Sequence, residues 1–314
     1  MTTVVVALGG NALTKPGEAG TAAEQASNAA RMAVSVGELV TAGHRIVVTH
    51  GNGPQVGNVA IQQFAARDVV PALPLHLIGA MTQGYMGSII IRALWNQLPG
   101  HRGRLAAIIT HAIVRKDDAN AAFSEPTKPI GPFLEDDDVT DATARGWTVA
   151  EDSGRGHRRI VPSPRPREVL EAAAIESLLD NGFLVVAGGG GGIPIIRNPD
   201  GLQGVEAVID KDRLAVQIAL AVKAEVLALV TGVDHVLLGF GTPHERSIGR
   251  MTTSEAAHFM AAGEFPAGSM GPKIESAIEF VDGGGEYAVI TSTDQLAAAL
   301  RGEAGSRVVR NSAA

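Results

Sequence analysis

Cysteine is absent from this chain of 314 residues. Its absence excludes disulfides, thiolate nucleophiles and metal sites built on cysteine, although it does not identify the cellular compartment. Aromatic residues make up only 4% of the chain, and the formal net charge is -7. A nucleic-acid-binding protein needs a cationic surface and, for single strands, aromatic side chains on which bases stack. The composition therefore argues against a nucleic-acid partner.

Long apolar runs are also lacking. A membrane-spanning helix needs about 18 apolar residues in succession, and the nearest approach, residues 214–233, is interrupted by Lys223 and Glu225. The N-terminus has no basic segment, and its apolar run is broken from Gly9 onward before it could serve as a signal peptide. We therefore expect no membrane association and a cytoplasmic protein, with 45% hydrophobic residues for a sizeable core.

Short Val- and Ile-rich runs alternate with helical patterns along the chain. Such alternation predicts an α/β fold with a mainly parallel sheet covered on both faces. Strands are expected at residues 3–8, 45–50, 105–110, 183–187, 226–231 and 288–291, with a further edge strand at residues 307–310. Helices are expected at residues 22–42, 54–66, 81–97, 167–181 and 212–222.

Residues 112–166 depart from this pattern because they are polar and rich in proline, glycine and charge. A stretch of this length is too long for an ordinary connection, and we interpret it as an insert, hairpin or lid. Its acidic run, residues 135–138 with Asp141, is better explained as a solvated surface than as a metal site. No convincing metal-ligand or Ser-His-Asp arrangement is found, and His50 and His111 are interpreted as packing or hydrogen-bonding residues and not as catalytic bases.

Three glycine-rich segments directly follow predicted strands: Gly9-Gly10-Asn11, Gly51-Asn52-Gly53 and Gly188–Gly192. Ligands of open α/β sheets bind beyond the carboxyl ends of the strands, and glycine lets backbone N–H groups face an anion. Tight turns or a flexible linker are the plainer explanations. The repetition favours a ligand, and close approach of that ligand is the expected reason for the five successive glycines around Gly190.

Two lysines stand at predicted helix starts, Lys211 within Asp210-Lys211-Asp212 and Lys273 directly after Pro272. A helix N-terminus disfavours a cation by up to about 1 kcal/mol, and a broken local rule often marks a functional site. A solvated charge cluster with Asp210 as helix cap is the alternative for the first lysine. An anion shared by each lysine and its helix start would remove the conflict, and phosphate is the leading candidate. Asp212 is placed to hold both ammonium groups.

Eight segments, in order along nearly the whole chain, resemble carbamate kinase within the amino acid kinase superfamily. They are residues 9–13, 50–57, 128–133, 151–156, 161–164, the glycine run ending in Ile193-Pro194, residues 204–212 and residues 270–273. The resemblance implies a three-layer αβα sandwich around a mainly parallel open sheet, with a protruding subdomain. It implies one kinase domain over residues 1–314, with a carbamate lobe (1–222, insert about 112–166) and a nucleotide lobe (223–314).

The activity implied by the resemblance is reversible phosphoryl transfer between ATP and carbamate, giving ADP and carbamoyl phosphate, with Mg²⁺ accompanying the nucleotide. It further implies a homodimer and, in many organisms, ATP synthesis at the end of arginine breakdown. The implied substrate-binding residues are Gly9, Gly10, Asn11, Gly51, Asn52, Gly53 and Gly190. The implied catalytic residues are Lys128, Lys211, Asp212 and Lys273. The implied nucleotide-binding residues are Lys211, Thr231, Gly232, Asp234, Met270 and Lys273. Without the resemblance, residues 231–234 could equally form a plain turn.

Two positions depart from familiar patterns. Many members of the superfamily have a lysine in the first strand at the position of Ala7. Carbamate kinases, like this chain, have alanine there, and the resemblance implies that Lys211 takes the role of that lysine. His157 stands where an aromatic residue is expected, which leaves the packing of the insert open. Two alternatives remain: a superfamily kinase acting on another carboxylate or phosphate acceptor, and a catalytically silent nucleotide-binding protein.

Overall fold

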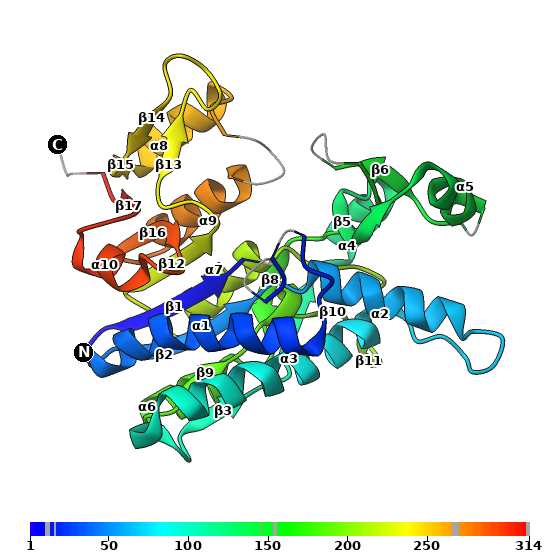
Figure 1. Ribbon diagram of the computed structural model, residues 1–314, viewed down its shortest axis with the longest axis horizontal. Coiled ribbons are helices and arrows are strands. Elements are labelled where there is room, and N and C mark those ends of the chain that lie inside the picture. Colours follow the sequence, from blue (N-terminus) through cyan, green and yellow to red (C-terminus); the bar gives the residue numbers. More distant parts are fainter. Residues whose placement is uncertain (10–12, 16, 145, 153–155, 266–269, 312–314) are drawn as a thin grey trace.

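The computed structural model describes residues 1–9, 13–15, 17–144, 146–152, 156–265 and 270–311. Its centre is an eight-stranded sheet in the order β15-β17-β16-β12-β1-β2-β9-β3 (Figure 1). Neighbouring strands run parallel except β16 and β17. The strands are β1 (Thr3–Leu8), β2 (Arg45–His50), β3 (Leu105–Ala107), β9 (Leu184–Val186), β12 (Val226–Thr231), β15 (Arg250–Thr252), β16 (Tyr287–Ser292) and β17 (Ser306–Val309).

Both faces of this sheet are covered, because its central strands are apolar on both sides. In β1, Val4 and Val6 pack into one hydrophobic cluster and Val5 and Ala7 into the other. The first cluster contains residues of α1 (Ala22–Thr41), α3 (Leu75–Gln97) and α10 (Leu296–Arg301). The second contains residues of α6 (Ala172–Asp180), α7 (Lys211–Ala221), α8 (Thr253–Ala261) and α9 (Gly271–Asp282). The predicted three-layer αβα sandwich is confirmed.

The insert forms a separate lobe that extends to the right of the sheet in Figure 1. A three-stranded antiparallel sheet with the order β5-β7-β6 is its framework. Its elements are α4 (Lys116–Ser124), β5 (Lys128–Leu134), α5 (Asp136–Ala144), β6 (Val149–Glu151) and β7 (His157–Val161). The root of the insert packs on the core through an apolar cluster that includes Val56, Ile130, Val161 and Val208.

The remaining elements frame the two ends of the sandwich. A four-stranded sheet, β11-β10-β4-β8, lies beside the root of the insert. A two-stranded ribbon, β13-β14, lies in the C-terminal part. These elements are β4 (His111–Val114), β8 (Pro166–Val169), β10 (Ile193–Asn198), β11 (Gly201–Gly204), β13 (Val236–Leu238), β14 (Arg246–Ile248), α2 (Gly53–Ala65) and the short 3-10 helices η2 (Pro99–His101) and η3 (Gly189–Gly191).

Several element predictions were wrong in detail. The helix expected at residues 81–97 begins earlier, at Leu75. The helix expected at residues 167–181 begins only at Ala172, because residues 166–169 form strand β8. Proline is tolerated there since β8 is the last strand of its sheet and needs no ladder N–H on that side. The strand expected at residues 105–110 ends at Ala107. The C-terminal strand is β17, and β15 lies outside it, so it is not the edge of the sheet.

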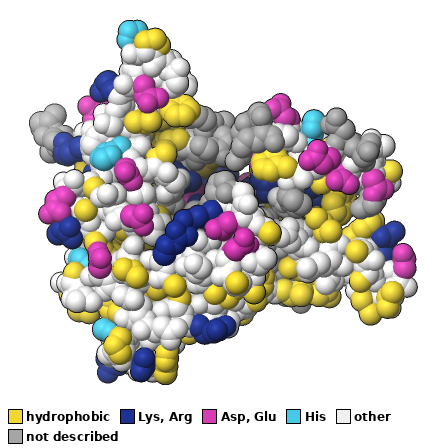
Figure 2. All heavy atoms as spheres, viewed as in Figure 1, with side chains coloured by type: hydrophobic (Ala, Val, Ile, Leu, Met, Phe, Trp, Pro, Cys, Tyr) yellow, Lys and Arg dark blue, Asp and Glu magenta, His cyan; other side chains and the backbone are white. Residues whose placement is uncertain are grey.

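Within the part of the chain that the structure describes, no helix is long and apolar enough to cross a membrane. The face in Figure 2 shows described acidic and basic side chains interspersed. Apolar side chains gather at its lower right, where the segment after α2 exposes Val69, Val70 and Leu73. The surface thus has local apolar areas among mixed charges.

Candidate active site

Strand β1 is the point at which the strand order reverses, since β2, β9 and β3 lie on one side and β12, β16, β17 and β15 on the other. Such a switch point opens a crevice at the carboxyl ends of the parallel strands. Gly9 directly follows β1, and a Cβ atom on Gly9 would lie 3.2 Å from the carbonyl oxygen of Val230 in β12. Gly10 and Asn11 lie outside the described residues.

The segment after β2 opens helix α2 at the same crevice. The backbone N–H of Gly51 donates to the carbonyl of Leu8 at 3.1 Å, which ties this segment to the end of β1. Asn52 is buried, and its side-chain amide donates to the hydroxyl of Thr82 on α3 at 2.7 Å. It makes no side-chain hydrogen bond to the start of α2. The amide of Asn52 is thereby fixed beside Gly53, the first residue of α2.

The five-glycine segment is packed against the protein itself. A Cβ atom on Gly189 would lie 2.5 Å from His50 Nε2, and one on Gly190 would lie 2.1 Å from Asn52 Nδ2. A Cβ atom on Gly191 would meet the carbonyl oxygen of Ile209 at 2.2 Å. Close packing against other parts of the chain is enough to explain why these positions are glycine. Close approach of a ligand, the reason inferred from the sequence, is not needed to explain them. The role of Gly190 in substrate binding stays a prediction.

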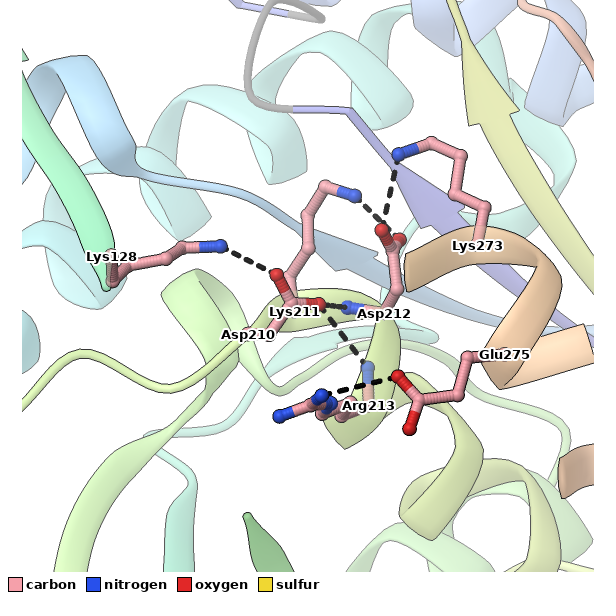
Figure 3. Close-up of polar contacts among 7 residues, drawn as sticks. All are labelled: Lys128, Asp210, Lys211, Asp212, Arg213, Lys273 and Glu275. Atoms are coloured by element: carbon pink, nitrogen blue, oxygen red, sulfur yellow. Dashed lines mark hydrogen bonds and ion pairs between the residues drawn. The ribbon is translucent and has the colours of Figure 1, made fainter. Parts of the chain in front are cut away.

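Lys211 and Lys273 converge on one carboxylate (Figure 3). Lys211 is the first residue of α7 and Lys273 lies in the first turn of α9, beside a proline. Their ammonium groups contact opposite oxygens of Asp212, Lys211 at 2.5 Å and Lys273 at 3.1 Å. The side chains are 11%, 12% and 4% exposed for Lys211, Lys273 and Asp212. Two separated helix starts therefore present a paired cation that is mostly shielded from water.

Burial and charge act against each other in this cluster. Burial lowers the pKa of Lys211, and the Asp212 carboxylate only partly offsets it. For Lys273, burial also favours the neutral amine, but Asp212 outweighs it and the pKa lies above its ordinary value. Burial would raise the pKa of Asp212, yet the two lysines hold it below its usual range. Attraction between Asp212 and the two lysines thus opposes the loss of charge that burial alone would favour in all three groups.

Lys128 is connected to the cluster through Asp210, which the sequence predicted only as a possible helix cap. Lys128 begins strand β5 of the insert, and its ammonium group contacts Asp210 Oδ2 at 2.5 Å. Asp210 Oδ1 accepts hydrogen bonds from the backbone N–H groups of Asp212 at 2.9 Å and Arg213 at 3.4 Å. Burial would raise the pKa of Asp210, but Lys128 and Lys211 hold it far below its usual range. The structure thus brings Lys128, Lys211 and Lys273 to one end of α7.

An ion pair joins α7 directly to α9, and no periodic pattern in the sequence indicated it. Arg213 on α7 contacts Glu275 on α9 at 3.1 Å (Figure 3). Arg165, between β7 and β8, contacts Glu275 on α9 at 3.2 Å and Glu279 on the same helix at 2.6 Å. Because Lys211 and Lys273 belong to these two helices, the pair of Arg213 with Glu275 opposes any sliding that would separate the lysines.

The residues predicted to border the nucleotide lie on the other side of the switch point. Thr231 ends β12 and is half-buried, whereas Gly232 and Asp234 are exposed. Met270 directly precedes α9 and is half-buried. Thr231, Gly232 and Asp234 lie at the carboxyl end of β12, and Met270 lies at the start of α9. Both places are at the end of the sheet where the lysines lie. Their contacts with a nucleotide stay a prediction.

Among residues the structure describes, no group of three or more His, Asp or Glu side chains is arranged to hold a metal ion. Both carboxylate oxygens of Asp212 already accept from lysines. A divalent cation at this site would therefore need oxygens from another source, such as a bound polyphosphate.

Known proteins resemble this chain in both sequence and fold. The sequence profile of the amino acid kinase family matches residues 2–292. A carbamate kinase from Thermococcus kodakarensis is 45% identical over 99% of this chain and 100% of its own length. The structure of carbamate kinase from Giardia lamblia bound to citric acid has a TM-score of 0.93 at 38% identity, covering 99% of both chains. The Giardia enzyme bound to AMP-PNP gives a TM-score of 0.89 at the same identity and coverage.

The chain belongs to the amino acid kinase family and has the fold of its phosphotransferases. The relatives just described are carbamate kinases that match it over nearly their whole length, and it shares their enzymatic class.

Proposed function

We propose that this protein transfers a phosphoryl group reversibly between ATP and carbamate, through the site at the starts of α7 and α9. The observation that carries the proposal is the contact of Lys211 and Lys273 with the two oxygens of buried Asp212. Phosphoryl transfer depends mainly on positioning and on compensation of negative charge. A rigid, partly dehydrated pair of ammonium groups supplies both.

In the proposed reaction a carbamate oxygen attacks the γ-phosphorus of ATP, and the bond from that phosphorus to the bridging oxygen of ADP breaks. Carbamate is already an anion, so no base is needed to remove a proton from it. Lys211 and Lys273 neutralise the transferring group, and Asp212 holds both in place. Lys128 contacts the carbamate or carbamoyl phosphate from the insert. This substrate is surrounded, in our proposal, by Gly9, Gly10, Asn11, Gly51, Asn52, Gly53 and Gly190. Holding carbamate in line with the γ-phosphorus lowers the entropic part of the reaction barrier.

The nucleotide is placed beside Thr231, Gly232, Asp234 and Met270, in the lobe formed by residues 223–314. Support comes from their position at the carboxyl end of β12 and from the AMP-PNP complex of the Giardia relative. Mg²⁺ would enter with the nucleotide, since magnesium usually binds substrate phosphates with few protein ligands. When bound, it would neutralise phosphate charge beside the lysines.

We further propose that the protein is a homodimer formed through α3 and the open edge of the sheet. Strand β3 is the last strand on its side, and α3 packs beside it. Leu77, Met81 and Trp95 of α3 are exposed, as is Ile109 after β3. An open strand edge next to exposed apolar side chains favours association with another copy. A cytoplasmic location stays the prediction made from the sequence.

The direct test is ATP formation from ADP and carbamoyl phosphate by the purified protein with Mg²⁺, compared with the same assay after addition of EDTA. Acetylglutamate, aspartate and UMP, each supplied with ATP, test the alternative acceptors. ATP formation that depends on carbamoyl phosphate and Mg²⁺ would support the proposal. Phosphorylation of another acceptor alone would favour a different substrate, and no turnover at all would favour the silent nucleotide-binding alternative.

A further inference from the structure

Asp210 has two different partners, one on each carboxylate oxygen. Oδ1 accepts from the N–H groups of Asp212 and Arg213 and so caps α7. Oδ2 accepts from the ammonium group of Lys128, which lies 82 positions earlier in the chain. One side chain therefore connects the helix start that carries Lys211 to the strand of the insert that carries Lys128.

Capping alone does not require this arrangement. Asparagine or serine caps a helix about as well as aspartate does, and neither brings a negative charge into a cationic anion site. Asp210 is mostly buried, with 16% of its side chain exposed. A buried carboxylate that reduces the positive charge of a phosphate-binding site opposes binding unless it has another role. That role is indicated by its second partner, Lys128, whose side chain is 27% exposed.

We propose that Asp210 is a positioning residue that holds the ammonium group of Lys128 over the start of α7. An ammonium group has three hydrogen-bond donors. Asp210 occupies one of them and leaves two directed elsewhere. Lysine side chains have about 2 kcal/mol of rotamer entropy, so a lysine fixed in advance binds its anion more tightly than a free one. This inference rests on the proposed contact between Lys128 and the substrate.

The apolar root of the insert makes this role specific to the side chain. Ile130 and Val161 of the insert pack with Val208 of the core, and the N–H of Val208 donates to the carbonyl of Pro162 at 3.0 Å. These contacts hold the backbone of β5 without Asp210. Asp210 therefore fixes the end of the Lys128 side chain and not the placement of the whole insert.

The test is Asp210→Asn in the full-length enzyme, because asparagine keeps the cap oxygen and loses the charge that attracts Lys128. We expect KM for carbamoyl phosphate to rise about tenfold, the scale of one lost charge-assisted hydrogen bond. KM for ADP should stay close to wild type, and the melting temperature should fall because the charge of Asp210 is stabilised by Lys128 and Lys211. Asp118→Asn is the matched control, since Asp118 pairs with Arg167 at 2.8 Å on the exterior of the protein; it should leave both KM values unchanged.

A double-mutant cycle with Lys128→Ala separates the inference from the function on which it rests. If Asp210 acts through Lys128, adding Asp210→Asn to Lys128→Ala raises KM for carbamoyl phosphate no further. An equal rise in both backgrounds, or a lower KM in Asp210→Asn alone, would overturn the positioning role. Unchanged KM in Lys128→Ala would instead refute the proposed substrate contact of Lys128. A folded Asp210→Asn variant with wild-type KM, alongside an impaired Lys128→Ala, refutes the inference alone.

Discussion

At the scale of single residues, a lysine at a helix start is not by itself a site. Lys116 also begins a helix, α4, and is followed by two aspartates, yet it is exposed. Lys211 and Lys273 differ because tertiary packing buries them and gives them one shared carboxylate. Burial strengthens their interaction with an anion, because water screens it less.

This difference yields the first prediction. Lys211→Ala and Lys273→Ala should each lower kcat by about 100- to 1,000-fold, as loss of one preorganised electrostatic group does. Lys116→Ala, which removes an exposed lysine from a comparable helix position, should leave kcat unchanged. Steady-state kinetics in the direction of ATP formation measures all three. Near-normal turnover in both of the first two variants would contradict their assigned roles.

His50 provides a pH-dependent prediction. Burial lowers the pKa of this imidazole to about 4, against an ordinary value of 6.5. Between these values the unfolded chain takes up a proton that the native protein does not, so stability falls as the pH drops. The full loss is about 3 kcal/mol. Urea unfolding of wild type and His50→Gln at pH 7 and pH 4 should show the wild type losing more by about this amount. Parallel losses in the two proteins would refute it.

At the scale of elements, the contact between α2 and β5 seats the insert on the core. A Cβ atom on Gly57, inside α2, would lie 1.8 Å from the Cα of Gly131 in β5. Glycine is unfavourable within a helix, so its presence there is explained by the close approach of two backbones. The insert is thus fixed on the core by the close fit of β5 against α2.

Gly57→Ala should therefore force β5 away from α2 and move Lys128 with it. We expect a loss of about 1–3 kcal/mol in unfolding free energy, typical of overpacking, and a higher KM for carbamoyl phosphate. Gly79→Ala is the matched control, because Gly79 is also inside a helix, α3, and a Cβ atom there would meet no atom within 4 Å. That variant should gain up to about 1 kcal/mol. Urea unfolding measures the unfolding free energy of both variants. Equal changes in the two variants would contradict the packing argument.

At the scale of the whole molecule, the sandwich brings the two proposed ligand regions to one end of one sheet. The segments after β1 and β2 belong to the proposed substrate region, and the segment after β12 belongs to the proposed nucleotide region. Because β1 and β12 are adjacent and parallel, the two regions meet where the strand order reverses.

The proposed dimer gives the last prediction. Met81 is 44% exposed on α3, and Met81→Glu would place a charge in the proposed interface. We expect analytical ultracentrifugation to show a dimer for the wild type and a shift toward monomer for this variant, since an unpaired buried charge is costly. Phe123→Glu, at an equally exposed apolar residue of the insert, should remain dimeric. A wild-type monomer, or dissociation by both substitutions, would contradict the proposed face.

The sequence by itself determined the α/β class and most of the central strands, because buried parallel strands are continuous apolar runs that few other structures produce. Residues 3–8, 45–50 and 226–231 were predicted with the observed bounds. The sequence also indicated Lys211 and Lys273, since a cation is unfavourable at a helix start, and Asp212, whose charge is opposite to theirs. These signals are local, and local patterns depend only on neighbours along the chain.

Only the tertiary structure decided what depends on residues far apart in sequence. The second partner of Asp210 lies on the insert, the glycines at 189–191 are required by His50, Asn52 and Ile209, and β15 covers β17 at the edge of the sheet. The burial that separates Lys211 from Lys116 is likewise set by elements packed from other parts of the chain. Such contacts leave no periodic trace in the sequence, because each is made by one pair of residues and not by a repeating face.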